Sequence, residues 1–245
     1  MEISKYLAEK SVALATLPIW TTAELTSRFT THGYRERQSQ MIETCRHESG
    51  HALVALLTDI EKITGFRIST LRQVTIKRVH QLLHGIPFTS RLRPSAGYIK
   101  TRGHEPETKE EEQKLILMRL AGIASEIGID FQKAIYCPTH LTQVPDFQEV
   151  VPYIRTSMLQ NKSSADDVRI FSKAKEIIID LARLFETPYF HSSIQLLTEY
   201  LRKELRYFGE DTGDRMLEHL RQHGITNGLV EKMRVDLLSI DTHSH

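Results

Sequence analysis

One short segment of the chain combines residue types and spacing that suit metal chemistry. His47 and His51 stand four residues apart in the sequence HESGH, and Glu48 directly follows the first histidine. On a helix, residues four apart lie on the same face, so both imidazoles can bind one zinc ion. Glu48 then projects beside the metal, where a general base must stand to take a proton from a water molecule. The segment predicts a zinc site with a catalytic base.

Three other pairs of residues have a spacing that could suit a metal, but each lacks part of a complete site. They are His80 with His84, His219 with His223, and Cys137 with His140. The two histidine pairs have no residue between them that could act as a base, and the Cys–His pair has no matching second half. Exposed or core-edge histidines are the favoured interpretation of the two histidine pairs, and a buried or idle cysteine is the favoured interpretation of Cys137. Cys45 is expected to lie on a different side of the helix from His47, in the core.

A catalytic zinc site needs a third protein ligand and leaves its fourth position to water. The residues after His51 are apolar or small as far as Thr58, so the same segment offers no third ligand. The acidic pair Asp166 and Asp167 is the most suggestive place, at the head of a predicted later helix. The same pair would also suit simple capping of that helix. Spacing alone leaves both interpretations open.

The elements that must position these residues follow from periodicity and from cap signals. A helical pattern from Gln38 to Ile60 carries the histidines. Thr108 and Glu111 form a capping-box pattern that opens a helix to about Ile129. The other predicted elements are strands at Arg72–Lys77 and Ala96–Lys100 and helices at 164–186, 192–207, 211–223 and 227–239. Residues 131–160 contain three prolines and are predicted to be irregular, with a turn or two of helix at most.

These elements predict an α+β fold that is mainly helical, in which the HExxH helix lies with a small β-sheet and a C-terminal helical bundle. Residues 1–36 are expected to form an N-terminal helical arm. Residues 37–245 are expected to form the metal-binding domain, with an insertion at 131–160 and a helical tail at 190–245.

Composition excludes several classes of protein. The 245 residues carry 32 Lys plus Arg against 31 Asp plus Glu, so the net charge of +1 gives no bulk reason to expect nucleic-acid binding. Two cysteines exclude a disulfide framework and favour a reducing, cytoplasmic location. None of the 12 glycines precedes a lysine, which excludes a phosphate-binding loop of the Walker type. Any energy-coupled activity would therefore need a separate partner.

Several stretches together resemble one known family. The segments HESGHALVALL, RQVTIK, SAGYIK, KEEEQKLILMRLAGIASEIG and SSADDVRIFSKAKEII occur in the order and approximate spacing of the peptidase domain of FtsH-type ATP-dependent zinc metallopeptidases. The resemblance extends from about Gln40 to Glu186. It implies a zinc ion bound by His47, His51 and Asp167, with Asp166 as the reserve ligand and Glu48 as the general base.

The resemblance also implies roles for two further elements. Gly97, Tyr98 and Ile99 correspond to the edge strand with which an extended substrate would pair, although an ordinary sheet strand is the simpler interpretation. The stretch LAGIASEI corresponds to a helix whose small residues pack tightly near the site. Glu126 on that helix would orient a ligating histidine or would be a plain surface carboxylate.

The sequence departs from the family in two respects. It shows no ATPase module and no membrane span, and the link between Glu126 and Ser163 is longer than in the family. The expected function is that of a zinc metalloendopeptidase acting on peptides or unfolded proteins. The alternatives are a non-catalytic, zinc-binding regulatory or adaptor protein, or a peptidase subunit that works only with a separate ATPase. A homo-oligomer is compatible with either.

Overall fold

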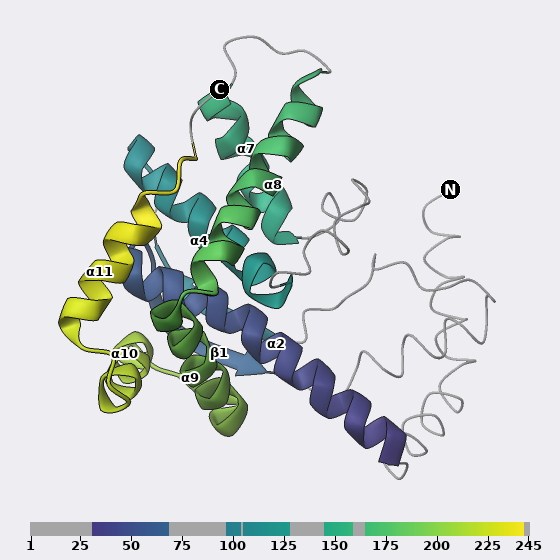
Figure 1. The fold of residues 1–245 in the computed structure, drawn as a ribbon, viewed down its shortest axis with the longest axis vertical. Coiled ribbons are helices and arrows are strands. Elements are labelled where there is room, and N and C mark those ends of the chain that lie inside the picture. Colours follow the sequence, from purple (N-terminus) through teal and green to yellow (C-terminus); the bar gives the residue numbers. More distant parts are fainter. Residues whose placement is uncertain (1–30, 69–96, 104, 128–144, 159–164, 243–245) are drawn as a thin grey trace, which may run out of the picture. The chain divides into compact units, whose positions relative to one another are not determined.

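In the computed structural model, seven helices and three strands make up the described part of the chain, which covers residues 31–68, 97–103, 105–127, 145–158 and 165–242 (Figure 1). The elements are α2 (Thr31–Thr58), β1 (Lys62–Ile68), β2 (Gly97–Arg102), α4 (Lys109–Ile127), α7 (Pro145–Met158), α8 (Ala165–Phe185), α9 (Pro188–Glu204), β3 (Arg206–Phe208), α10 (Thr212–Gln222) and α11 (Asn227–Leu238). The predicted α+β, mainly helical fold with a small sheet is confirmed.

Helix α2 is the element around which the others pack. Its second half contains a run of apolar residues, Ala52 to Ala55 and Leu57, and all of them are buried. A helix that is apolar on all sides has to lie inside a protein. The helix ends at Asp59, whose φ of 54° is left-handed and breaks the helical hydrogen-bond pattern. The histidine motif therefore lies about two to three turns before the end of a central helix.

The three strands form an antiparallel sheet in the order β2-β1-β3. Phe66 at the centre of β1 pairs with Ile99 of β2 and with Tyr207 of β3. The ring of Phe66 is fully buried and lies 5.9 Å from the ring of Tyr200 in α9, so this face of the sheet packs against helices. A register shift between Ile63 and Gly65 interrupts the alternation of β1.

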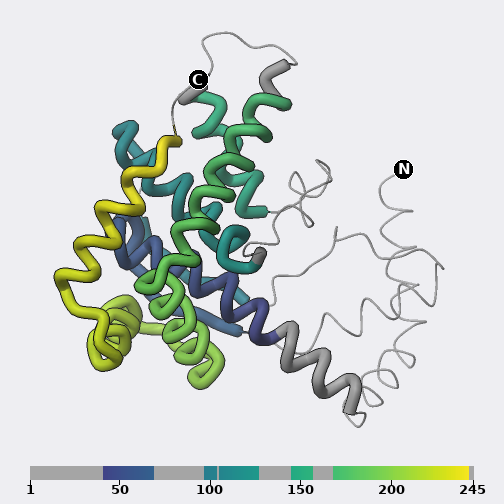
Figure 2. The backbone as a smooth tube through the Cα atoms, in the orientation of Figure 1, coloured from purple at the N-terminus to yellow at the C-terminus, as the bar shows by residue number. Residues whose placement is uncertain are grey.

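The remaining helices form two groups along the chain (Figure 2). Helices α4, α7 and α8 pack against one another, and they bring together segments that are separated in sequence by undescribed residues. Helices α9, α10 and α11 follow in sequence, α10 lying against α9 and β1 and α11 against α8 and α9. The capping box is formed as predicted, since Thr108 Oγ1 accepts from Glu111 N–H at 3.2 Å and Glu111 Oε2 accepts from Thr108 N–H at 3.2 Å.

Three elements differ from the sequence prediction. Residues 145–158, expected to be irregular, form the 14-residue helix α7, which accommodates Pro152 on an exposed side. Strand β1 was not predicted, because Gly65 and the register shift interrupt its alternation. Strand β3 was assigned to the end of a helix, whereas α9 ends at Leu205 with a φ of 60°.

Some predictions lie outside the described residues. They concern the arm at 1–30, the strand Arg72–Lys77, the His80 and His84 pair, and the pair Cys137 and His140. Residues 42–68 and 97–245 group into one unit of the chain, which contains all the elements described here except the first residues of α2. Within the described part of the chain, no helix is both long and apolar enough to cross a membrane.

Candidate metal centre

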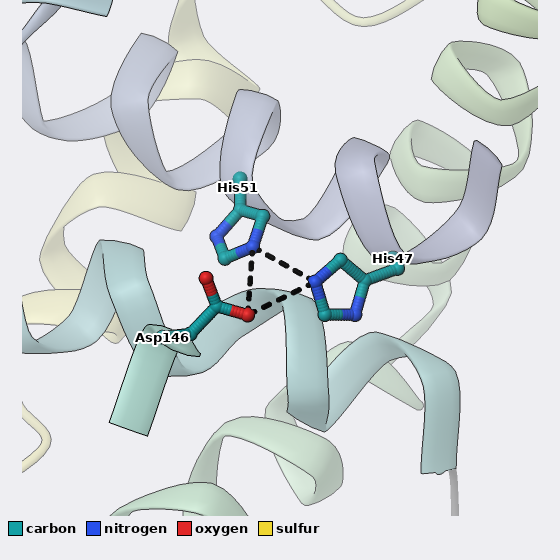
Figure 3. Close-up of side chains that lie close together, drawn as sticks. All are labelled: His47, His51 and Asp146. Atoms are coloured by element: carbon teal, nitrogen blue, oxygen red, sulfur yellow. Dashed lines mark hydrogen bonds and ion pairs between the residues drawn. The ribbon is translucent and has the colours of Figure 1, made fainter. Parts of the chain in front are cut away.

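Two histidines of α2 and one aspartate of α7 converge on a common point (Figure 3). His47 Nε2 lies 3.1 Å from His51 Nε2 and 3.1 Å from Asp146 Oδ2. The third separation, from His51 Nε2 to Asp146 Oδ2, is 3.7 Å. The two imidazole rings meet edge to face at 77°, as expected for side chains that converge rather than stack. This His47–His51–Asp146 cluster could bind a metal ion.

The three distances are compatible with a tetrahedral metal site. With metal–ligand bonds of about 2.0–2.2 Å, two ligand atoms of a tetrahedral site are roughly 3.3 Å apart. The triangle formed by the two nitrogens and the carboxylate oxygen has a circumradius of about 1.9 Å, so a point about 2.0–2.1 Å from all three atoms exists just above its plane. No side chain would have to move for the three atoms to bind one ion.

The other ring nitrogen of each histidine has its own acceptor. His51 Nδ1 donates to the backbone carbonyl of Met118 at 2.7 Å, and His47 Nδ1 contacts the carboxylate of Glu126 at 3.3 Å. Histidines that bind metals usually donate this second N–H to a carbonyl or carboxylate, which fixes the ring orientation and the tautomer. Of the two interpretations of Glu126, the contact matches that of an orienting partner for His47.

These contacts leave a deficit of positive charge at the centre of the cluster. A carbonyl oxygen can only accept, so Nδ1 of His51 carries a proton. If each ring carried its only proton on Nδ1, two lone pairs and a carboxylate would face one another. Burial acts to lower the pKa of His47, but hydrogen bonds to Asp146 and Glu126 outweigh it and raise that pKa to about 10. A cation at this point, either a proton or a metal ion, would balance the lone pairs and the carboxylate.

The carboxylate of Asp146 responds in the opposite way. Burial acts to raise its pKa, but hydrogen bonds from His47 and His51 and their positive charge outweigh burial and hold the pKa far below its usual range. Asp146 is therefore an anion at neutral pH, the form in which a carboxylate binds a metal. Like the two histidines it is only partly buried, and one side of the cluster is thus open to solvent.

Glu48 lies next to this cluster without being one of its three donors. Its side chain is 6% exposed. Burial raises its pKa, and the charges of His51 and His47 act against this rise. The backbone of Ile99 in β2 also acts to lower that pKa, so the Glu48 carboxylate lies close to strand β2. Glu48 therefore occupies a buried place between the metal donors and strand β2.

The contact between α2 and α4 depends on small residues. A Cβ atom at Gly122 would collide with His51 Nε2 and would lie 2.7 Å from His47 Nε2. A Cβ atom at Gly50 would collide with the carbonyl of Ala121, and the Oγ of Ser125 donates to the carbonyl of Arg46 at 2.8 Å. The expectation that the LAGIASEI helix packs tightly beside the site agrees with this geometry.

The carboxylate in the cluster is not one that the sequence suggested. Asp146 lies in the first turn of α7, inside the region predicted to be irregular. The predicted ligand Asp167 lies in the first turn of α8, but its side chain and that of Asp166 are outside the described residues, so the assignment of Asp167 stays a prediction. One signal for Asp146 was present: a proline followed by an aspartate is typical of the first turn of a helix.

Two other candidates have contacts of their own. His223 Nδ1 donates to the carbonyl of His219 within the same helix, and the ring of His219 packs against Tyr200 at 5.1 Å. Cys45 is fully buried, and its burial raises the pKa of the thiol to about 12, so the thiol is a core side chain rather than a metal ligand. The core position predicted for Cys45 is confirmed.

A pocket of about 350 Å³ lies along the same two helices that position Asp146 and Gly122. Arg119 at its wall bridges Glu61 at 3.2 Å and Glu149 at 3.0 Å. Arg119 precedes Gly122 by three residues on α4, and Glu149 follows Asp146 by three residues on α7, so each pair shares a helix face. The bridge therefore fixes the position of α7 against α4 close to the metal donors.

Comparison with models of known protein families finds no match, and no curated protein matches the chain. The fold and the cluster are therefore interpreted from their own geometry.

Proposed function

We propose that the chain is a zinc-dependent metalloendopeptidase in which Glu48 is the general base. The observation that carries the proposal is the convergence of His47 Nε2, His51 Nε2 and Asp146 Oδ2 at separations of 3.1–3.7 Å. Two imidazoles and one carboxylate form a donor set that zinc uses in hydrolases, with the fourth position left for water or substrate. When bound, zinc supplies a Lewis acid that polarises a carbonyl group and lowers the pKa of water.

The partial exposure of the donors supports a catalytic role over a structural one. Structural zinc sites are closed by four protein ligands, and among the described residues only three donors converge here. A structural site would also have no use for a buried carboxylate beside it. Glu48 is such a carboxylate. It would accept the proton of the attacking water and return a proton to the leaving amine.

Strand β2 supports a peptide as the substrate. Within the described sheet β2 is an edge strand, since it pairs with β1 alone. An extended peptide can add to such an edge through main-chain hydrogen bonds, which tolerate many sequences. Gly97, Tyr98 and Ile99 would make these bonds, and the proximity of Ile99 to Glu48 supports a peptide bound next to the base.

The test measures zinc content and cleavage of an unfolded protein by the same preparations. Glu48→Gln should keep the fold and about one zinc per chain, and it should lower the cleavage rate at least a hundredfold, because an amide cannot accept the proton. Glu43→Gln makes the same change at an exposed position of the same helix and should leave the rate unchanged.

The possible outcomes separate the proposal from its alternatives. Zinc binding without cleavage by the wild-type chain would favour a regulatory or adaptor protein. Cleavage that appears only after addition of a separate ATPase would favour a peptidase subunit. Equal cleavage by the wild-type chain and Glu48→Gln would show that the general base has been misassigned.

A further inference from the structure

The outer face of the sheet, opposite the helices, has an unusual composition. Cross-strand partners share a face and alternate along each strand. Phe66 and its partners face the helices, so Arg67 and its partners Tyr98 and Arg206 face the other way. The next set on this outer face is Gly65 with Lys100 and Phe208, and beyond the register shift comes Lys62 with Arg102. Every side chain that these pairs place on the outer face is basic or aromatic.

The two aromatic side chains form a pair in the middle of this face. Tyr98 is 42% exposed and Phe208 is 51% exposed, although both are large and largely apolar. Their ring centroids are 6.4 Å apart, and the ring of Phe208 lies over Gly65, where a Cβ atom would collide with it. The glycine thus allows Phe208 to lie flat on the sheet, and the pair presents a platform to solvent.

Basic side chains surround this platform, and acidic ones are few. Arg67, Lys100 and Arg206 are exposed on the three strands. Lys62 and Arg102 both contact Glu210, at 3.4 and 3.6 Å, and these weak exposed pairs leave most of the positive charge uncompensated.

The sequence shows the same separation of charge. Residues 62–102 contain nine of the 32 Lys plus Arg residues of the chain and none of its 31 Asp plus Glu residues. The net charge of +1 sums this basic stretch with the rest of the chain, which is more acidic. The expectation of no nucleic-acid partner was based on that sum. Four of the nine, Lys62, Arg67, Lys100 and Arg102, lie on the described strands, and a local surplus of basic side chains attracts polyanions whatever the total charge of the molecule.

We propose that the outer face of the sheet binds single-stranded nucleic acid. Exposed aromatic rings on an antiparallel sheet stack on bases of any type, and the surrounding cations contact the phosphates. Duplexes keep their bases stacked inside and cannot use the rings in this way. A purely electrostatic partner such as an acidic peptide would use the cations but would gain nothing from two exposed aromatic rings.

The test is fluorescence anisotropy with labelled oligouridine and oligothymidine of about 12 nucleotides, a length within the range that one such surface covers. A chelator is present throughout. Binding should weaken with salt with a slope of about −0.7 for each phosphate contact, hence about −2 to −3.5 for three to five cations. A duplex of the same sequence should bind at least about tenfold more weakly, since it offers phosphates without free bases.

The variants separate charge from stacking. Arg67→Glu with Arg206→Glu should weaken binding about a hundredfold at 0.1 M salt, because two contacts become repulsive. Phe208→Ala should weaken binding about tenfold through loss of stacking on one base. Arg183→Glu with Arg221→Glu makes the same charge change at exposed positions of α8 and α10 and should have little effect. Circular dichroism checks the fold of each variant. Lys100→Gln with Arg206→Gln removes two positive charges without adding negative ones, and it serves as the milder charge variant.

The outcomes either support or overturn the proposal. It is overturned if neither oligonucleotide binds, or if the variants on α8 and α10 weaken binding as much as those on the sheet. It is also overturned if polyglutamate or anionic vesicles bind as tightly as the oligonucleotides and Phe208→Ala has no effect. Binding that persists in Glu48→Gln and in His51→Ala would show that this surface acts independently of the metal centre.

Discussion

The candidate metal centre and the outer face of the sheet, for which we propose different functions, are built in opposite ways. At the metal centre three atoms from two helices converge within 3.7 Å, and each of the two histidines makes a further contact through its other ring nitrogen. On the sheet, five basic and two aromatic side chains are spread over three strands and extend into solvent. The first site depends on every one of its members, and the second shares its binding among many. Mutations should reveal this difference directly.

The largest effect is expected for His51→Ala. The change removes one of three donors together with its anchor on the Met118 carbonyl, so zinc affinity should fall by well over a hundredfold. Zinc content after dialysis and competition with a chromophoric chelator would measure it. His223→Ala, at an exposed position of the C-terminal helices, should retain zinc. Full zinc occupancy of His51→Ala would place the metal elsewhere in the chain.

A paired substitution distinguishes the two candidate carboxylates. Asp146→Ala should abolish tight zinc binding, because Asp146 Oδ2 is the oxygen that faces both imidazoles. Asp167→Ala should cost at most about 1 kcal/mol of stability as a lost helix cap. The resemblance to the FtsH-type family predicts the reverse ranking. The same zinc competition assay on both variants decides between them, with thermal unfolding as the measure of stability.

A side chain added at Gly122 should weaken zinc binding nearly as much as the loss of a ligand. The Cβ atom of Gly122→Ala would collide with His51 Nε2 and would lie 2.7 Å from His47 Nε2, so it would displace the two nitrogen donors. Zinc affinity should fall at least about tenfold even though alanine favours helices over glycine. Gly213→Ala is the matched control, since its Cβ would meet nothing closer than 3.6 Å. A stable Gly122→Ala protein with wild-type zinc affinity would contradict the proposed metal position.

A smaller loss is expected for the partner of His47. Glu126→Gln keeps the size of the side chain but removes the charge that holds the His47 ring, so zinc affinity or activity should fall about 10–100-fold. The loss should be clearly smaller than that of His51→Ala, measured in the same assay. An unchanged affinity would return Glu126 to the interpretation of a surface carboxylate.

The smallest effect is expected for a single substitution on the outer face of the sheet. Lys100→Gln removes one cation of several, so the salt slope of oligonucleotide binding should become shallower by only about 0.7 and the affinity should change a few-fold. Zinc content should stay unchanged. A complete loss of binding from this single change would mean that the outer face is a concentrated site like the metal centre.

The two histidines of the metal centre could be predicted from the sequence, whereas the carboxylate Asp146 could not. The spacing of His47 and His51 determines their common face once the segment is a helix, and the apolar run after them indicates that helix. The third donor comes from a residue 95 positions further on, and no local spacing rule determines which carboxylate the fold carries there. The three prolines in residues 131–160 also concealed α7, because Pro152 is tolerated on an exposed helix side.

The same limits explain the errors in the sheet. Strand β2 was predicted from its aromatic and β-branched residues, whereas β1 was missed because Gly65 and the register shift interrupt its alternation. Strand β3 has only three residues and directly follows a long helix. The outer face becomes visible only when the three strands are aligned, since its basic and aromatic residues come from three separate places in the chain.

The close contact between α2 and α4 has a consequence for finding other proteins with this centre. Gly50 and Gly122 are required to lack a side chain, and Ser125 joins the two helices through the carbonyl of Arg46. A two-part signature therefore describes the centre better than the histidine motif alone: His-Glu-x-Gly-His in one segment and Ala-Gly-x-x-Ser-Glu in a later one. Chains that share only the His-Glu-x-Gly-His segment would have the two histidine ligands without the helix that packs against them and orients them.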